Sequence, residues 1–305
     1  MESNSNITYH FKYVEHCNMC GSPASGHKIL GKRLNRSQGL NPRNKIGITT
    51  TIQKCKKCSL IYGNPMPVVD SLQDHYGVVP NDYWKPEYFD LDENYFKAQI
   101  DIYKQLKGDL NGHIALDIGA GIGKAMIALG KAGFNAYGIE PSEPFYEKAI
   151  EQMKISGDHL QNCAIEDYKG MDNYYDFVTF GAVLEHLYYP SESIQRVLGW
   201  LKPGGLIQIE VPSSAWFTNS IYNFLYKVQG LDYVGNISPM HTPYHLYEFA
   251  LKSFELNGKK NGYQVVKHRY MVCSTYLPKV IDPIVKPYMK LTNRGMQLEV
   301  WLQKL

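Results

Sequence analysis

The stretch Leu116-Asp117-Ile118-Gly119-Ala120-Gly121-Ile122-Gly123 decides the fold, because an apolar run ends there in a turn with three glycines. In open α/β sheets, ligands bind at the carboxyl ends of the strands, where a strand meets its helix. Glycine lets a ligand approach the backbone closely and adopts positive φ without a steric penalty. The spacing is G-x-G-x-G rather than the G-x-G-x-x-G of dinucleotide-binding folds. Alone, the turn is weak evidence for a ligand, since glycine turns also serve packing.

Strands and helices alternate in the part of the chain that follows residue 86. Apolar runs predict strands over 114–118, 136–139, 177–180 and 206–211, and helical spacing predicts helices over 93–107, 123–131, 144–153 and 191–201. Two more strands are expected over 265–272 and 296–303, joined by a connection that contains three prolines. Apolar strands that alternate with helices indicate a parallel sheet covered on both faces. We therefore predict an α/β domain over residues 86–305.

Two carboxylates accompany the glycine turn. Asp117 lies two residues before the first glycine, and a buried carboxylate at that point needs partners such as backbone amides or a ligand ammonium. Glu140 ends the next strand, 19 residues beyond Gly121. An acid in that position accepts hydrogen bonds from both hydroxyls of a ribose. The alternative for Glu140 is a helix-capping or surface acid, but its pairing with the turn favours a nucleoside ligand.

Four of the six cysteines form two C-x2-C pairs, Cys17 with Cys20 and Cys55 with Cys58. Four thiolates in this pattern are typical of a closed, tetrahedral, structural zinc site. The other two cysteines stand alone, which favours a metal in a reducing compartment over disulfides. A module this small has little core, so zinc supplies much of its folding energy. Residues 1–85 are predicted to be a zinc-binding module with a connecting segment.

The composition, 44% hydrophobic and 20% charged, is that of an ordinary soluble protein. No apolar run approaches the roughly 20 residues that span a bilayer, and the polar start lacks the regions of a signal peptide. We therefore expect a cytoplasmic protein. Residues 1–85 carry 11 Lys and Arg against 5 Asp and Glu, a net +6, although the whole chain is only +3. Such a basic front module is suited to a phosphate-bearing substrate or nucleic acid, unless it is simply a solvated surface.

Residues 114–211 resemble the core of the class I S-adenosylmethionine-dependent methyltransferases. Residues 117–123 match the first motif of that family, and 137–142 match its ribose-binding motif. Residues 175–180 and 201–205 match the motifs at the fourth strand and at the entry to the fifth. Four ordered motifs at family spacing are highly specific together. The resemblance implies a Rossmann-like seven-stranded sheet whose last strand is antiparallel.

The resemblance also implies which residues hold S-adenosylmethionine. Those of the glycine turn and the ribose motif are Asp117, Gly119, Ala120, Gly121, Gly123, Glu140 and Pro141. Ile165 and Glu166 are expected beside the adenine, and Ala182 and Val183 along the methionine arm. Ile165 is alternatively a simple core residue.

The front module, at residues 55–65, resembles the end of a zinc ribbon that a subset of these enzymes carries. That subset includes C-methyltransferases of nucleotide-linked deoxysugars, in which a Tyr-x-Glu-His cluster supplies catalytic groups. This chain has no such string, and its nearest set is His245-Leu246-Tyr247-Glu248. The resemblance to the subset is therefore weakest at the acceptor.

Two groups of side chains are candidates for acceptor chemistry. Glu185 and His186 follow the fourth strand, and a histidine with a near-neutral pKa suits proton transfer. His245 and Tyr247 belong to a second set, His241 to Glu248, at the end of an aromatic-rich insertion over about 212–250 that is typical of an active-site cover. The alternative is that these histidines only order the loops or bond backbone carbonyls.

These observations support three hypotheses of function. The first is methyl transfer from S-adenosylmethionine to a small molecule, such as a sugar, a nucleotide-linked sugar or a natural-product intermediate. The second is an RNA methyltransferase whose zinc module binds the nucleic acid, although no Asn-Pro-Pro-Tyr-type motif follows the fourth strand. The third is a binding protein without turnover, which the intact glycines and Glu140 disfavour. The oligomeric state and the methylated atom are left open.

Overall fold

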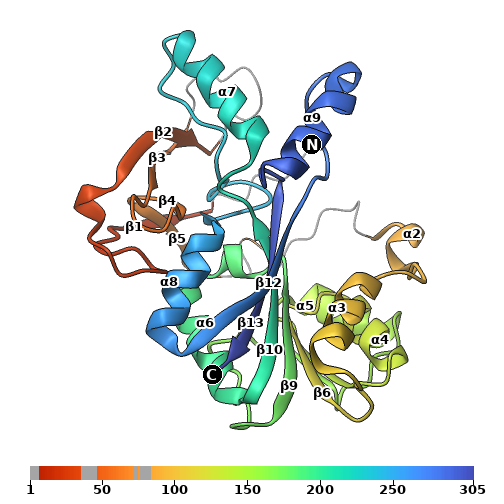
Figure 1. The fold of residues 1–305 in the computed structure, drawn as a ribbon. Helices are drawn as coiled ribbons and strands as arrows, with labels where there is room; N and C mark the ends of the chain where they lie inside the picture. The colour runs from red at the N-terminus through yellow and green to blue at the C-terminus, as the bar shows by residue number, and fades with distance from the viewer. Residues whose placement is uncertain (1–6, 36–46, 72–74, 76–83) are drawn as a thin grey trace.

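A seven-stranded mixed sheet forms the centre of the computed structural model, which describes residues 7–35, 47–71, 75 and 84–305 (Figure 1). The strand order is β12-β13-β10-β9-β6-β7-β8. The strands are β6 (Ile114–Ile118), β7 (Asn135–Ile139), β8 (Leu160–Gln161), β9 (Tyr175–Gly181), β10 (Leu201–Pro212), β12 (Tyr263–Met271) and β13 (Gln297–Lys304). The predicted α/β sheet is confirmed.

The last strand, β13, lies inside the sheet and runs against both of its neighbours. It pairs antiparallel with β10, from Leu206 opposite Gln303 to Pro212 opposite Gln297, and antiparallel with β12. The pairs β10–β9, β9–β6, β6–β7 and β7–β8 are parallel. This is the single reversed strand that the family resemblance implies.

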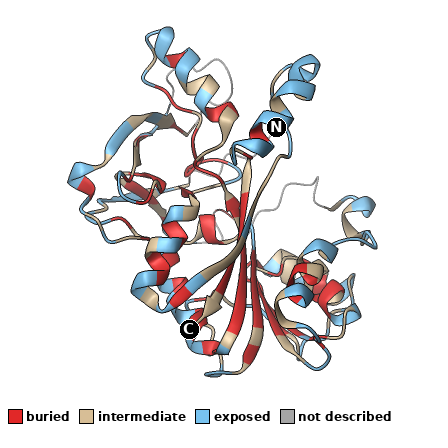
Figure 2. Cartoon of the chain, viewed as in Figure 1, coloured by how far each residue is buried: buried red, intermediate tan, exposed pale blue. Residues whose placement is uncertain are grey.

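Helices cover both faces of the sheet because its strands are apolar on both sides. On one side lie α3 (Lys97–Lys107), α4 (Lys124–Lys131) and α5 (Glu143–Glu151), and on the other α6 (Pro190–Trp200) and α8 (Leu251–Asn261) (Figure 1). Neighbouring residues of a strand point to opposite faces. Phe177 accordingly packs with Tyr103 of α3, whereas Val178 belongs to the core layer that contains Phe254 of α8. Figure 2 shows the burial concentrated along these strands.

The front of the chain forms two small sheets beside α8. β1 (Tyr9–Lys12) pairs with β5 (Met66–Val69). A four-stranded sheet has the order β11-β4-β3-β2, with β2 (Lys28–Leu34), β3 (Thr49–Lys54), β4 (Ile61–Gly63) and β11 (Tyr247–Glu248). The fourth strand comes from far along the chain, since Tyr247 pairs with Tyr62. The front sheet is thus completed by the segment that was predicted to cover the active site.

The remaining helices lie in the connections. They are α2 (Pro86–Phe89), α7 (Phe217–Val228), α9 (Asp282–Leu291) and the short 3-10 helices η1 (Ala24–Gly26), η3 (Leu184–His186) and η4 (Lys279–Ile281). Helix α9 occupies the proline-containing connection for which the sequence predicted no helix. None of the helices in the described part of the chain is long and apolar enough to cross a membrane.

Candidate active site

The glycine turn joins β6 to α4 and leaves open space above its backbone. Gly119, Gly121 and Gly123 have φ of 69°, 56° and 81°, a region that residues with a Cβ rarely adopt. The Gly119 and Ala120 amides both donate to the Ile139 carbonyl, at 2.9 and 3.0 Å, which ties the turn to β7. A Cβ at Gly119 would meet Val183 at 2.5 Å, whereas one at Gly121 would meet no atom within 4 Å. The turn is closed on one side and open at Gly121.

The Glu140 carboxylate faces this turn from the end of β7. Its Oε2 accepts a hydrogen bond from the Gly121 amide at 2.7 Å, and its Oε1 accepts one from the Ser142 amide at 2.8 Å. Burial raises the pKa of Glu140 to about 6, and the two amides oppose that rise. A carboxylate has lone pairs beyond those two contacts. It is therefore able to accept further hydrogen bonds from ligand hydroxyls.

Asp117 lies deeper in the same corner. Its side chain is 5% exposed, and burial, followed by the nearby charge of Glu140, raises its pKa to about 8. Tyr95, which the sequence did not single out, belongs to this corner too: burial raises its pKa to about 12, and the charges of Asp117 and Glu210 add to the rise. A bound cation such as a sulfonium or ammonium would stabilise the ionised form of Asp117 and so lower its raised pKa.

The other predicted cofactor residues lie at the neighbouring strand ends. Ile165 is buried at 4% exposure, and Glu166 beside it is exposed. Ala182, which follows β9, has a φ of 56°, a strained conformation for a residue with a Cβ. Val183 packs against Gly119. Pro141 is half-buried beside Glu140. Their roles as cofactor contacts stay predictions.

Glu185, His186 and His245 form one cluster just beyond Val183. The Glu185 Oε1 lies 4.0 Å from His186 Nε2 and 3.8 Å from His245 Nε2. The two imidazole centroids are 5.0 Å apart. The Leu246 amide donates to the Glu185 carbonyl at 2.9 Å, and this contact joins η3 to the segment that carries His245. The fold thus brings together three of the four predicted catalytic residues.

In this cluster Glu185 is buried and the two histidines are half-buried. Burial raises the pKa of Glu185 to about 8 and lowers the pKa of His186 to about 4 and of His245 to about 3. Neither Glu185 oxygen has a hydrogen-bond partner within the part of the chain that the structure describes. One oxygen of Glu185 and one ring nitrogen each of His186 and His245 lie within 4.8 Å of one another, a spacing that would also fit a metal ion.

A stacked pair of rings, Tyr244 on His75, packs beside this cluster. His186 Nδ1 donates to the Tyr244 carbonyl at 3.3 Å, and the Tyr244 ring stacks on His75 with centroids 3.9 Å apart. The Tyr9 hydroxyl lies 3.2 Å from His75 Nε2. His75 was not anticipated, because a lone histidine in an aromatic segment carries no spacing signal.

Tyr247, the fourth predicted catalytic residue, lies elsewhere. Its ring is 1% exposed, and its hydroxyl donates to the Tyr188 carbonyl at 2.8 Å and accepts from Asn18 at 3.2 Å. Its place in β11, against the front sheet, points it toward the cysteine pairs. We therefore assign Tyr247 to the joint between the two parts of the chain rather than to acceptor chemistry.

Residues 91–268 match a family model described as a methyltransferase domain. The chain belongs to this methyltransferase family. Among curated proteins, it is 26% identical over 167 residues to a ubiquinone biosynthesis O-methyltransferase of Bordetella avium, which covers 52% of this chain and 64% of that protein. The protein of the same name in Pseudomonas savastanoi is 28% identical, over 60% of this chain and 75% of that one.

Among solved structures, the methyltransferase resembles phosphoethanolamine N-methyltransferase 2 of Haemonchus contortus, determined in complex with S-adenosyl-L-methionine. The TM-score is 0.50 at 17% identity, over 80% of this chain and 62% of that chain. This likeness shows the fold. The chain spans less than two thirds of the length of the Bordetella relative.

The four cysteines of the two C-x2-C pairs of this methyltransferase converge. All four sulfur atoms lie within 4.8 Å of one another, with Cys17–Cys58 at 3.5 Å and Cys20–Cys55 at 3.6 Å. Tetrahedral zinc with Zn–S bonds of about 2.3 Å places sulfurs about 3.8 Å apart. The contact with Cys17 lowers the pKa of Cys58 to about 5, which favours a thiolate at this position. The site fits zinc in ligand number, spacing and chemistry.

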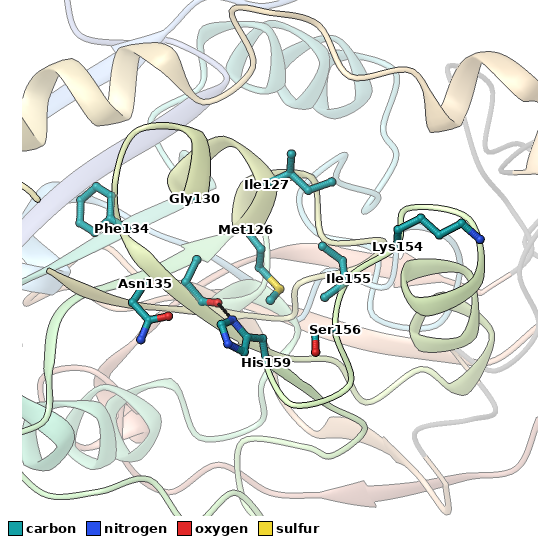
Figure 3. A pocket seen from close by; sticks show the side chains of 10 residues that line it. Met126, Ile127, Gly130, Phe134, Asn135, Lys154, Ile155, Ser156 and His159 are labelled. Atoms are coloured by element: carbon teal, nitrogen blue, oxygen red, sulfur yellow. Dashed lines mark hydrogen bonds between the residues drawn. The ribbon is translucent and has the colours of Figure 1, made fainter. Parts of the chain in front are cut away.

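A separate hollow of about 250 Å³ lies between α4 and the loop before β8 (Figure 3). Its lining is largely apolar, with Met126, Phe134 and Ile155. His159 there donates through Nδ1 to the Ala136 carbonyl at 3.1 Å and stacks on Tyr137. The hollow includes Asn135 and Ala136 at the amino end of β7, whereas Glu140 follows the carboxyl end of that strand, and we assign no role to the hollow.

Proposed function

We propose that the protein transfers the methyl group of S-adenosylmethionine to a small-molecule acceptor. The observation that supports this most is the hydrogen bond between Glu140 and the Gly121 amide, which places a buried carboxylate beside open backbone at the first strand–helix corner. Membership of the methyltransferase family points to the same reaction.

The cofactor would bind across the carboxyl ends of β6 and β7. The ribose hydroxyls donate to Glu140, and the open face of Gly121 admits the adenosyl group. Asp117 offers a negative charge near the methionine end, where its raised pKa falls once a cation binds. Val183 and Ala182 line the approach to the methyl group, and Ile165 covers the adenine.

The acceptor would meet the methyl group beside Glu185, His186 and His245. In the in-line displacement, an acceptor lone pair forms the new bond to carbon while the carbon–sulfur bond breaks. One of the neutral imidazoles takes the acceptor proton. The Glu185 carboxyl group lies 3.8 to 4.0 Å from both rings, and the imidazolium that results lowers its raised pKa, so that Glu185 ionises and balances the new charge. Glu185 is thus a positioning and charge-balancing residue rather than the base.

The acceptor class we favour is a sugar, a nucleotide-linked sugar or another natural-product intermediate. The front module supports a small molecule, because β4 pairs with β11, two residues beyond His245, and so forms a wall of the acceptor region. We propose that residues 1–85 are a zinc-binding module and that residues 86–305 are the methyltransferase domain. Residues 212–250, which include α7, are proposed to cover the acceptor.

Calorimetry with S-adenosylmethionine, followed by a mass-shift screen of nucleotide-linked sugars and hydroxylated natural products, tests the proposal. A gain of about 14 mass units on one acceptor, as the replacement of a hydrogen by a methyl group requires, would support it. Absence of cofactor binding would refute it. Methylation of RNA instead, with affinity that falls steeply as salt rises, would identify the nucleic-acid alternative.

A further inference from the structure

Arg33, on β2 of the front module, reaches the segment between α7 and β11. The backbone aligns the two parts: the Lys32 amide donates to the Asp232 carbonyl at 2.7 Å, and the Val234 amide donates to the Lys32 carbonyl at 3.1 Å. The Arg33 guanidinium lies 5.2 Å from the centre of the Tyr233 ring. Arg33 therefore places a positive charge from the front module against the segment between α7 and β11.

The guanidinium has partners, but all of them are neutral. Nη1 donates to the Tyr233 hydroxyl and to the Val234 carbonyl, and Nη2 donates to His241 Nε2 at 3.1 Å. Across the described ranges, no carboxylate oxygen lies within 4 Å of Arg33. Burial lowers the pKa of Arg33 and the charge of Glu248 acts to raise it, but Glu248 already accepts hydrogen bonds from Asn219, Asn236 and the Ile237 amide. An arginine that is half-buried, with its Nε atom fully enclosed, and that has no ionic partner is unusual.

Two donors in this cluster are buried and unused. Since His241 Nε2 accepts from Arg33, the proton of the neutral ring is on Nδ1, and that N–H finds no acceptor in the described part of the chain. The Arg33 Nε–H is likewise buried and has no acceptor in the described part of the chain. His241 is only 7% exposed. A donor that is buried without a partner destabilises the folded chain, so the cluster is arranged for an acceptor that the protein itself does not supply.

We propose that Arg33 and His241 bind an oxyanion of the methyl acceptor, a phosphate or a carboxylate. An oxyanion supplies both the missing counter-charge and the missing hydrogen-bond acceptors. The inference rests on the proposed function, because it names a chemical feature of the acceptor at the same site.

The cluster is well placed to orient such an acceptor. His241 and His245 leave the same short loop, and both contact Ser238: the His241 amide donates to the Ser238 carbonyl at 3.4 Å, and the Ser238 amide donates to the His245 carbonyl at 3.0 Å. The Tyr244 amide donates to the His241 carbonyl at 2.7 Å. An oxyanion at Arg33 would fix this loop and, with it, the imidazole of His245 that faces the reacting atom.

Calorimetric titration of the zinc-loaded full chain, at fixed salt, tests the inference with three probes: pyrophosphate, uridine diphosphate and a hydroxybenzoate. Binding of the first two indicates a phosphate, and binding of the third a carboxylate. Arg33→Gln should lower the affinity for the probe that binds at least about tenfold, as loss of a charge-assisted pair requires. His241→Phe should weaken it severalfold. Lys32→Gln removes the same charge from the next residue, an exposed lysine paired with Asp232, and should change the affinity less than twofold.

Other readouts separate this site from a structural role. Arg33→Gln should melt no lower than the unaltered protein, because it removes a half-buried charge that has no ionic partner and keeps a side-chain donor, and Arg33→Lys should retain part of the binding. The inference is overturned if no probe binds while S-adenosylmethionine does, or if Lys32→Gln loses as much affinity as Arg33→Gln. It is also overturned if Arg33→Gln and Arg33→Lys both unfold. Failure of S-adenosylmethionine to bind the unaltered chain would instead refute the proposed function.

Discussion

Asn257 of helix α8 donates a hydrogen bond to the Met19 carbonyl, within the first cysteine pair, at 2.8 Å. The same side chain donates to the Ser191 hydroxyl at 2.7 Å and accepts from the Tyr263 hydroxyl at 2.9 Å. Asn257 is completely buried. One amide therefore fastens the cysteine module to two elements of the central domain.

Replacement of Asn257 by alanine should destabilise the whole protein by roughly 2–4 kcal/mol, because it leaves several buried polar groups without partners. Urea unfolding measures the change. The matched control is Asn261→Ala, one helical turn away and only half-buried, which should cost less than about 1 kcal/mol. Equal effects of the two substitutions would contradict the joint described for Asn257.

Glu140→Gln should weaken S-adenosylmethionine binding at least about tenfold, because a neutral amide accepts fewer and weaker hydrogen bonds than the carboxylate. Calorimetry with the cofactor measures this. Glu143→Gln, an exposed acid in the first turn of α5, is the control and should leave the affinity within twofold. Unchanged affinity in Glu140→Gln would contradict the proposed hydrogen bonds between Glu140 and the ribose hydroxyls.

The same affinity should depend on pH. Burial raises the pKa of Glu140 to about 6, so the carboxylate that accepts the ribose hydroxyls is present above that pH and is lost below it. Cofactor affinity should therefore be flat from pH 7 to 8 and fall between pH 6 and 5. In Glu140→Gln, that fall should be absent. A fall of equal size in the variant would assign the titration to another group.

His186→Asn and His245→Asn should each lower kcat by about 10²-fold or more if the imidazoles take the acceptor proton. Because burial lowers their pKa values to about 4 and 3, both rings stay neutral above pH 5. At saturating cofactor, kcat should then hold its value down to about pH 5 instead of declining near 6.5. Near-normal rates in both variants would exclude histidine as the general base.

The purified chain should contain one zinc ion, measurable by elemental analysis, and cobalt substitution should give the absorption of a tetrahedral thiolate site. Cys58→Ser should lose the metal, lower the melting temperature and loosen the front sheet. Cys163→Ser removes a cysteine outside the cluster and should keep the metal. Full zinc content in Cys58→Ser would show that these thiols hold no ion.

Much of the central sheet could be predicted from local signals. β6 begins and ends at the predicted residues, because its apolar run is bounded by a polar turn and by glycines. β13 was recognised as a strand by its apolar residues, and the family resemblance implied that it is antiparallel, but its position between β10 and β12 was not predicted. Glu185 and His186 also followed from their place after the fourth strand.

The errors have physical causes too. Helix α9 was missed because Pro283 and Pro287 suggested a loop, yet Pro283 lies in the first turn, where a helix tolerates proline. The pairing of Tyr247 with Tyr62, some 185 positions earlier, was also not predicted, because nothing local in the sequence reveals it. Arg33 carried no signal, since its environment exists only after β2 meets the segment before β11.

The placement of β13 bears on how this protein can be divided. The family match ends at residue 268, but residues 297–304 fill the gap between β10 and the edge strand β12. A recombinant fragment cut at the borders of sequence similarity would expose two long unsatisfied edges and should aggregate. The region that matches the family model is therefore shorter than the region that must be synthesised before the central sheet can form.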